Sequence, residues 1–106
     1  MNVLMCFDVD GVLDSSSKGV IIAQQLKELE ERGVIVVIVS PSPNFPRGRN
    51  NVSMFPRICD KSRADNLIDA VIWCQKQGLD PILKLYISDN GDYSEAMKAG
   101  FTYIDR

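Results

Sequence analysis

Two pairs of aspartates stand out as residues that could do chemistry. Asp8 and Asp10 follow a short apolar run near the N-terminus, and Asp89 and Asp92 follow another near the C-terminus. Asp8 and Asp10 are two residues apart at the end of a predicted strand, so they share one side of a sheet if the strand geometry continues that far. Paired carboxylates repel one another unless a cation lies between them or one binds a proton, so such pairs are costly without a use. Because hard oxygen ligands suit Mg²⁺, the pairs predict a magnesium site, with Gly11 as a sharp turn that gives a substrate close access to the backbone.

The residue types limit the other chemistry available. The sequence has no histidine, which excludes His-based zinc sites and Ser-His or Cys-His catalytic pairs. Cys6, Cys59 and Cys74 are odd in number, lack CxxC spacing and lie among apolar residues, so we expect buried, reduced thiols. Catalysis must therefore use carboxylates, lysine or a metal.

Apolar patterns predict the elements that must position the aspartates. Unbroken apolar runs indicate buried strands, and apolar residues at three- and four-residue spacing indicate amphipathic helices, one of them capped by Ser62. The stretch 41–51 holds three prolines and predicts an irregular loop. Its Arg47 and Arg49 are expected to face solvent rather than to bind phosphate. The expected order is strand 3–7, helix 20–33, strand 34–39, loop 41–51, strand 54–58, helix 62–78, strand 82–87, helix 93–99 and strand 101–104.

This order predicts an α/β fold. Strands that alternate with helices form parallel sheets with right-handed crossovers, and ligands bind beyond the carboxyl ends of the strands. The two aspartate pairs lie at such ends and meet only if the first and fourth strands are neighbours. A small Rossmann-like doubly wound sheet of about five strands in the order 3-2-1-4-5, with flanking helices, makes them neighbours and places Ser40 beside them. We expect residues 1–106 to form this single domain, without room for a cap domain.

Composition and charge narrow the classes of partner. Hydrophobic residues make up 45% of the chain and charged residues 25%, the balance of an ordinary globular protein rather than of a disordered or membrane chain. A formal net charge of -2 supplies no global positive field that recruits nucleic acid or an anionic membrane. The N-terminal apolar run lacks the basic flank and the length of a signal or an anchor. We therefore expect a cytoplasmic protein with no membrane partner.

The first motif carries a resemblance to a known superfamily. Residues 7–14 read Phe-Asp-Val-Asp-Gly-Val-Leu-Asp, which resembles the signature of the haloacid dehalogenase-like hydrolases, and nearly all of the chain follows that superfamily's order of motifs. The resemblance implies that Asp8 is the nucleophile and forms an aspartyl-phosphate. It implies that Asp10 protonates the leaving group and later activates water. Asp89, with Asp92 as a further candidate, would hold Mg²⁺ alongside Asp8 and the backbone carbonyl of Asp10.

The resemblance also assigns groups that bind the phosphoryl group. Ser40 would orient it through its hydroxyl, close to Gly11. Lys61, just before the helix that leads to the fourth strand, would neutralise the charge that develops. Arg63 and Lys84 compete with Lys61 for this role, and we favour Lys61 from its position in the motif order.

Two departures from the superfamily's pattern keep a second function open. Pro41 has no N–H to give, whereas relatives bind phosphate through the N–H at that place, and Asp92 follows Asp89 one residue sooner than in the commonest pattern. The leading hypothesis is an Mg²⁺-dependent phosphomonoester hydrolase, and the alternative is a catalytically degenerate module that binds metal, phosphate or a protein. A phosphoacceptor domain similar to response-regulator receivers fits least well, since Asp60 follows the third strand but no lysine follows the fifth.

A domain without a cap leaves its active site open. Such a site suits a large phosphorylated substrate, including a macromolecule, or a neighbouring subunit that acts as a lid in a homo-oligomer. Nucleic acid is disfavoured by the negative net charge. The expected cofactor is Mg²⁺.

Overall fold

The computed structural model of the protein describes residues 2–13, 20–41 and 52–106. Its elements alternate along the chain as predicted. The strands are β1 (Val3–Phe7), β2 (Val34–Ser40), β3 (Arg57–Cys59), β4 (Leu83–Ser88) and β5 (Thr102–Asp105). The helices are α1 (Ala23–Glu31), α2 (Arg63–Lys76) and α3 (Tyr93–Lys98).

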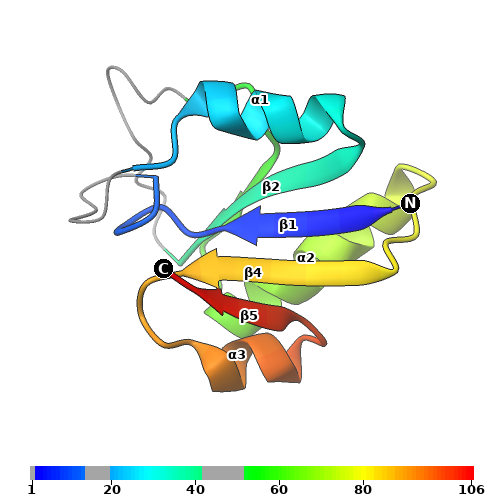
Figure 1. Ribbon diagram of the computed structural model, residues 1–106. Helices are drawn as coiled ribbons and strands as arrows, with labels where there is room; N and C mark the ends of the chain where they lie inside the picture. Colours follow the sequence, from blue (N-terminus) through cyan, green and yellow to red (C-terminus); the bar gives the residue numbers. More distant parts are fainter. Residues whose placement is uncertain (1, 14–19, 42–51) are drawn as a thin grey trace.

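The strands form one parallel sheet in the order β3-β2-β1-β4-β5 (Figure 1). β1 is central, and its last residue, Phe7, lies opposite Ile38 of β2 and Ile87 of β4. α1 packs on one face of the sheet, and α2 and α3 pack on the other. The predicted doubly wound α/β fold and its strand order are confirmed. The carboxyl ends of β2, β1 and β4 therefore lie side by side.

The unbroken apolar sequence of β2 follows from this covering of both faces. Val37 belongs to the core between the sheet and α2, whereas Val36 and Ile38 belong to the core under α1, where they meet the fully buried Leu26. Successive side chains of a strand point to opposite faces, so a strand covered on both faces needs apolar residues throughout. Burial of such side chains contributes on the order of 2 kcal/mol each and holds the strand ends in place.

The third strand begins later than the sequence pattern predicts. Phe55 packs into the core under α1 instead of continuing a strand. Pro56 has no N–H for a ladder, although its carbonyl accepts a hydrogen bond from the Ile38 N–H at 2.8 Å. β3 is therefore limited to Arg57–Cys59. The predicted loop 41–51, with Arg47 and Arg49, lies outside the described residues except for Pro41.

The cysteines are close to the prediction. Cys6 and Cys74 are buried, Cys59 is partly buried, and all three are free thiols. Burial raises the pKa of the Cys6 thiol well above its ordinary value, so this thiol is kept neutral. Within residues 2–13, 20–41 and 52–106, no helix combines the length and the apolar character needed to cross a bilayer.

Candidate active site

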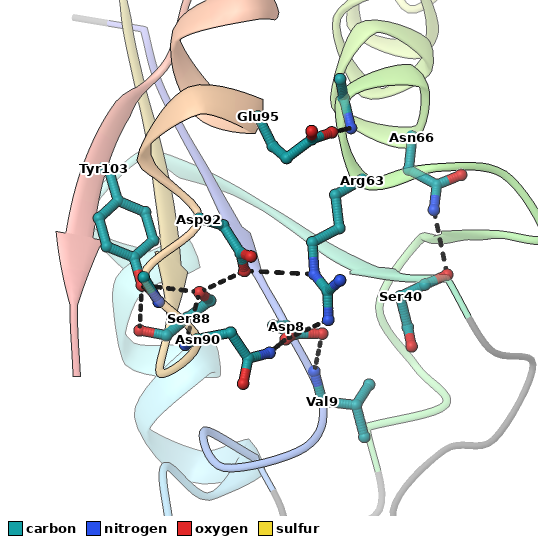
Figure 2. Close-up of polar contacts among 12 residues, drawn as sticks. Asp8, Val9, Ser40, Arg63, Asn66, Ser88, Asn90, Asp92, Glu95 and Tyr103 are labelled. Carbon is teal, nitrogen blue, oxygen red and sulfur yellow. Dashed lines mark hydrogen bonds and ion pairs between the residues drawn. The ribbon is translucent and has the colours of Figure 1, made fainter.

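The predicted meeting of strand ends is present in the structure. Asp8 follows β1 directly, and its N–H continues the ladder to the Ile87 carbonyl of β4 at 3.0 Å. Asp92 comes from the loop after β4, and Ser40 is the last residue of β2 (Figure 2). Because β1 lies between β2 and β4, these polar residues gather at one edge of the sheet.

Asp8 is a buried carboxylate. It is 2% exposed, and its Oδ1 accepts a hydrogen bond from the Val9 N–H at 2.9 Å. Burial raises its pKa from 3.8 to about 6; the Val9 N–H and the charge of Arg63 oppose the increase, while the charges of Asp92 and Asp10 reinforce it. A strongly perturbed acid at the carboxyl end of a central strand is typical of a functional site.

Asp8 gives folding stability a defined pH dependence. Its pKa is about 6 in the folded protein and near 3.8 in the unfolded chain, so between these values the folded state binds more protons. In EDTA, we expect the free energy of unfolding of the wild type, relative to Asp8→Asn, to fall by about 3 kcal/mol as the pH rises through this interval, and then to level off. Urea unfolding of both proteins measures the difference. A difference that stays flat or grows with pH would contradict the burial of this carboxylate.

Arg63 is the cation that faces Asp8. Its terminal nitrogen Nη2 lies 3.9 Å from Asp8 Oδ2, and its Nε lies 3.2 Å from Asp92 Oδ2. Burial alone would lower the pKa of Arg63, but the carboxylates of Asp92 and Asp8 outweigh burial and raise it. The guanidinium therefore stays charged and joins the end of β1 to the loop after β4.

The start of α2 is held firmly enough to aim this arginine. Arg63 is the first residue of the helix, and the predicted cap is confirmed, since Ser62 accepts a hydrogen bond from the Asp65 N–H at 3.3 Å. The side chain of Glu95, in α3, accepts a second hydrogen bond, from the Ala64 N–H at 3.2 Å. The first turn of α2 is thus tied both to its own cap and to α3.

Lys61 does not reach Asp8 in this arrangement. Its ammonium forms an ion pair with Asp69 at 2.7 Å, and its side chain is 56% exposed. The hydrogen bond and the charge of Asp69 raise its pKa. Of the two basic residues that the sequence offered at the start of α2, the structure brings Arg63 to Asp8 and leaves Lys61 on the surface.

Asn66 is a site residue that the sequence reasoning missed. It is fully buried, and its Nδ2 donates to the backbone carbonyls of Ser40 and Lys61, both at 3.1 Å. One amide therefore ties the end of β2 to the segment that leads into α2. The available signal was its position four residues before Ala70 on the inward face of α2, where a polar side chain needs partners.

The loop after β4 is fixed through Tyr103. Its hydroxyl lies 2.9 Å from Ser88 Oγ and accepts a hydrogen bond from the Gly91 N–H at 2.9 Å. Ser88 in turn donates to Asp92 Oδ2 at 2.8 Å. The Asp92 carboxylate is therefore held by Ser88 and Arg63, and its orientation is set from β5 through this chain of contacts.

Gly11 is required by the approach of Asp89. It has a positive φ of +78°, and a Cβ at this position would overlap the Asp89 carboxylate. Any other residue would therefore be strained and would also displace Asp89. The contact brings the loop after β1 against the loop after β4.

Asp10 is exposed to solvent, and it lies beyond β1, so its side chain does not follow the alternating directions of the side chains along that strand. The chain turns at Val9, whose carbonyl accepts hydrogen bonds from the N–H groups of Val12 and Leu13. The strand geometry therefore ends before Asp10. The carboxylate is still near enough for its charge to raise the Asp8 pKa.

Mg²⁺ remains the expected cofactor of this edge of the sheet. Carboxylate oxygens are suitable donors for Mg²⁺. In the described part of the chain, however, no three side chains of His, Cys, Asp or Glu lie close enough together to hold a metal. Asp92 is engaged by Ser88 and Arg63. The expected ligands Asp8, Asp89 and Asp92, together with the backbone carbonyl of Asp10, share this edge of the sheet, and the Mg²⁺ site stays a prediction.

Comparison of the chain with protein-family models, with curated proteins and with solved structures gives no match. The function must therefore be argued from the fold and from the chemistry of this edge of the sheet.

Proposed function

We propose that the protein is a phosphomonoester hydrolase that works through an aspartyl-phosphate on Asp8. The observation that carries the proposal is the buried Asp8 carboxylate at the carboxyl end of the central strand, with the Arg63 guanidinium 3.9 Å away. A phosphoryl group attacked by this oxygen would place its negative charge near a permanent cation. The resemblance of residues 7–14 to haloacid dehalogenase-like hydrolases supports the same chemistry.

The proposed reaction has two steps. In the first, a carboxylate oxygen of Asp8 attacks phosphorus, the ester P–O bond breaks, and the leaving oxygen takes a proton from the Asp10 carboxyl group. In the second, water attacks the phosphorus of the aspartyl-phosphate and gives a proton to the Asp10 carboxylate. The bond between phosphorus and Asp8 then breaks and inorganic phosphate leaves. The solvent exposure of Asp10 suits this exchange of protons.

Arg63 and Ser40 are the proposed phosphate-binding side chains. Arg63 can donate to phosphoryl oxygens with two nitrogens, in the geometry that guanidinium groups favour for phosphate. Ser40 is buried at the end of β2, and its carbonyl is held by Asn66, so its position is set by the backbone. Pro41, which follows, supplies no N–H. In this proposal, Arg63 contributes more to phosphate binding than the sequence pattern implied, since that pattern favoured Lys61.

Mg²⁺ stays part of the proposal as the expected cofactor. When bound, it would polarise the phosphoryl oxygens and offset their charge. The chemistry of the aspartate oxygens suits the ion, and Asp8, Asp89 and the backbone carbonyl of Asp10 are the groups that would hold it. Dependence on Mg²⁺ is therefore tested separately from turnover.

The proposed substrate is a phosphorylated molecule, including a phosphorylated macromolecule. Asp10, Asp89 and Asn90 are all exposed, so this edge of the sheet opens to solvent in the described residues. A second subunit that covers this edge is the alternative way to exclude water. The expected cytoplasmic location belongs to the same proposal and is supported by three free cysteines, which suit a reducing compartment.

Phosphate release and trapping of the intermediate test the proposal. Wild-type protein is incubated with small phosphomonoesters, nucleotides and phosphorylated proteins, in Mg²⁺ and in EDTA, and is quenched in acid before peptide mass spectrometry. We expect phosphate release from at least one substrate and a phosphoryl group on Asp8. Release with the phosphoryl group on another residue would overturn the assignment of the nucleophile.

A second candidate is a binding module without turnover. The specific observation in its favour is that Asp8, Asp89 and Asp92 do not converge, while Arg63 already neutralises Asp8 and Asp92. Phosphate that binds, by calorimetry, without release from any substrate would favour this module over the hydrolase.

A further inference from the structure

The side chain of Asn90 lies between the two strand-end loops. One end of its amide is 3.3 Å from Asp8 Oδ2, and the other end is 3.1 Å from Asp89 Oδ1. The end nearer Asp8 also lies 3.1 Å from Arg63 Nη2. Figure 2 shows the amide beside Asp8 and Arg63. The two ends of one neutral amide thus contact the carboxylates of Asp8 and Asp89.

The amide can make these contacts in two orientations. In one, Nδ2 donates to Asp8. Turned over, Nδ2 donates to Asp89 and Oδ1 accepts from Arg63, both at 3.1 Å. The second orientation is better paired, because the amide then makes two hydrogen bonds, to Asp89 and from Arg63, whereas in the first it makes one, to Asp8. In both, the amide occupies the same place.

The amide competes with a divalent ion for the two carboxylates. It contacts one oxygen of Asp8 and one oxygen of Asp89, so an ion shared by these oxygens has to replace both contacts. No three-residue metal cluster is present in the described residues. The positive charge next to Asp8 comes from Arg63 instead.

We propose that Asn90 determines whether this edge of the sheet can take a divalent cation: its amide fills the space between Asp8 and Asp89, and Mg²⁺ binds there only after the amide has left. The choice of Mg²⁺ rests on the proposed function. Asn90 is exposed, so its side chain can swing out without disturbing the core. The hydrogen bonds that the amide makes to charged groups must be broken for the ion to enter. Asn90 thereby weakens metal binding relative to a shorter side chain.

Calorimetric titration with MgCl₂, in the absence of any phosphate compound, tests the proposal. We expect Asn90→Ala to bind Mg²⁺ about tenfold more tightly than the wild type, which corresponds to about 1.4 kcal/mol. Gln75→Ala, which removes an exposed amide near the end of α2, is the matched control and is expected to bind as the wild type does. Urea unfolding checks that the variants fold, and Asn90→Ser replaces Asn90→Ala if the latter does not.

Several outcomes would overturn the proposal. Weaker Mg²⁺ binding by Asn90→Ala would make Asn90 a ligand of the ion, and unchanged binding would make its position irrelevant. A lack of detectable binding in both proteins would show that removing the amide opens no cation site. Because this titration contains no substrate, its failure is separate from that of the hydrolase, which is judged by phosphate release and by phosphorylation of Asp8.

Discussion

Replacing Asp8 by Asn is expected to lower kcat/KM for phosphate release on the order of 10³-fold or more. The variant keeps the size of the side chain and an oxygen that can accept from the Val9 N–H. It loses the anionic oxygen that attacks phosphorus, and a neutral amide is a poor nucleophile. Residual activity would come only from binding and orientation.

The same substitution is expected to leave the protein folded and more stable near neutral pH. The wild-type carboxylate is 2% exposed, and keeping it ionised there is costly. Asn carries no such charge, so the loss of activity cannot be attributed to unfolding. The two effects have opposite signs and are measured on one preparation, by phosphate release and by urea unfolding.

Asp80→Asn is the matched control for this experiment. Asp80 is an exposed aspartate just before β4, at the opposite end of the sheet from Asp8. We expect its activity and stability to stay close to the wild type. An Asp8→Asn variant that keeps activity within tenfold of the wild type would rule out Asp8 as the nucleophile.

The sheet could be predicted because its strands are covered on both faces. Val34 to Val39 is apolar throughout, and such a run fits a central parallel strand and little else. The strand order then followed from topology, since the two aspartate-bearing loops meet only when the first and fourth strands are adjacent. The start of the third strand was predicted too early, because a hydrophobic pattern does not distinguish Phe55 from Ile58. In the structure, Phe55 packs into the core under α1, Pro56 follows it, and Ile58 belongs to β3.

The side chains of the site were less predictable than the strand ends that carry them. Spacing along the chain could not show that Val9 turns the backbone before Asp10, nor that Asn90 would lie between Asp8 and Asp89. These outcomes depend on contacts between loops after different strands, which no local pattern records. The positions of such loops could be predicted, but not the directions of their side chains.

The choice between Lys61 and Arg63 shows the same limit. Both residues precede or open α2 and both are basic, so sequence position favoured neither on physical grounds. What separates them is their partners: Asp69, on the next turns of α2, draws Lys61 outward, whereas the capped first turn points Arg63 at Asp8 and Asp92. The positive charge at the site is therefore expected to come from Arg63.

Arg63→Gln is accordingly expected to lower kcat/KM by roughly 10²- to 10³-fold, the usual effect of removing a donor that stabilises a developing anion. Gln keeps a donor amide of moderate length but has no charge, so the phosphoryl oxygens lose their permanent cation. Lys61→Gln is expected to cost a few-fold at most, since that ammonium is already paired with Asp69. Arg63→Lys should fall between the two, because it retains the charge without the two-nitrogen fork.

Folding must be separated from catalysis in this comparison, because Arg63→Gln leaves Asp92 and Asp8 without their cation. Near-UV circular dichroism and urea unfolding establish whether the variant is native at the assay temperature, and Lys76→Gln, at the far end of α2, controls for the loss of a basic residue on the same helix. If Lys61→Gln lost the larger share of activity, Asp69 would have to release that lysine when substrate binds. The motif order would then have identified the phosphate-binding residue more accurately than the arrangement of side chains described for the free protein.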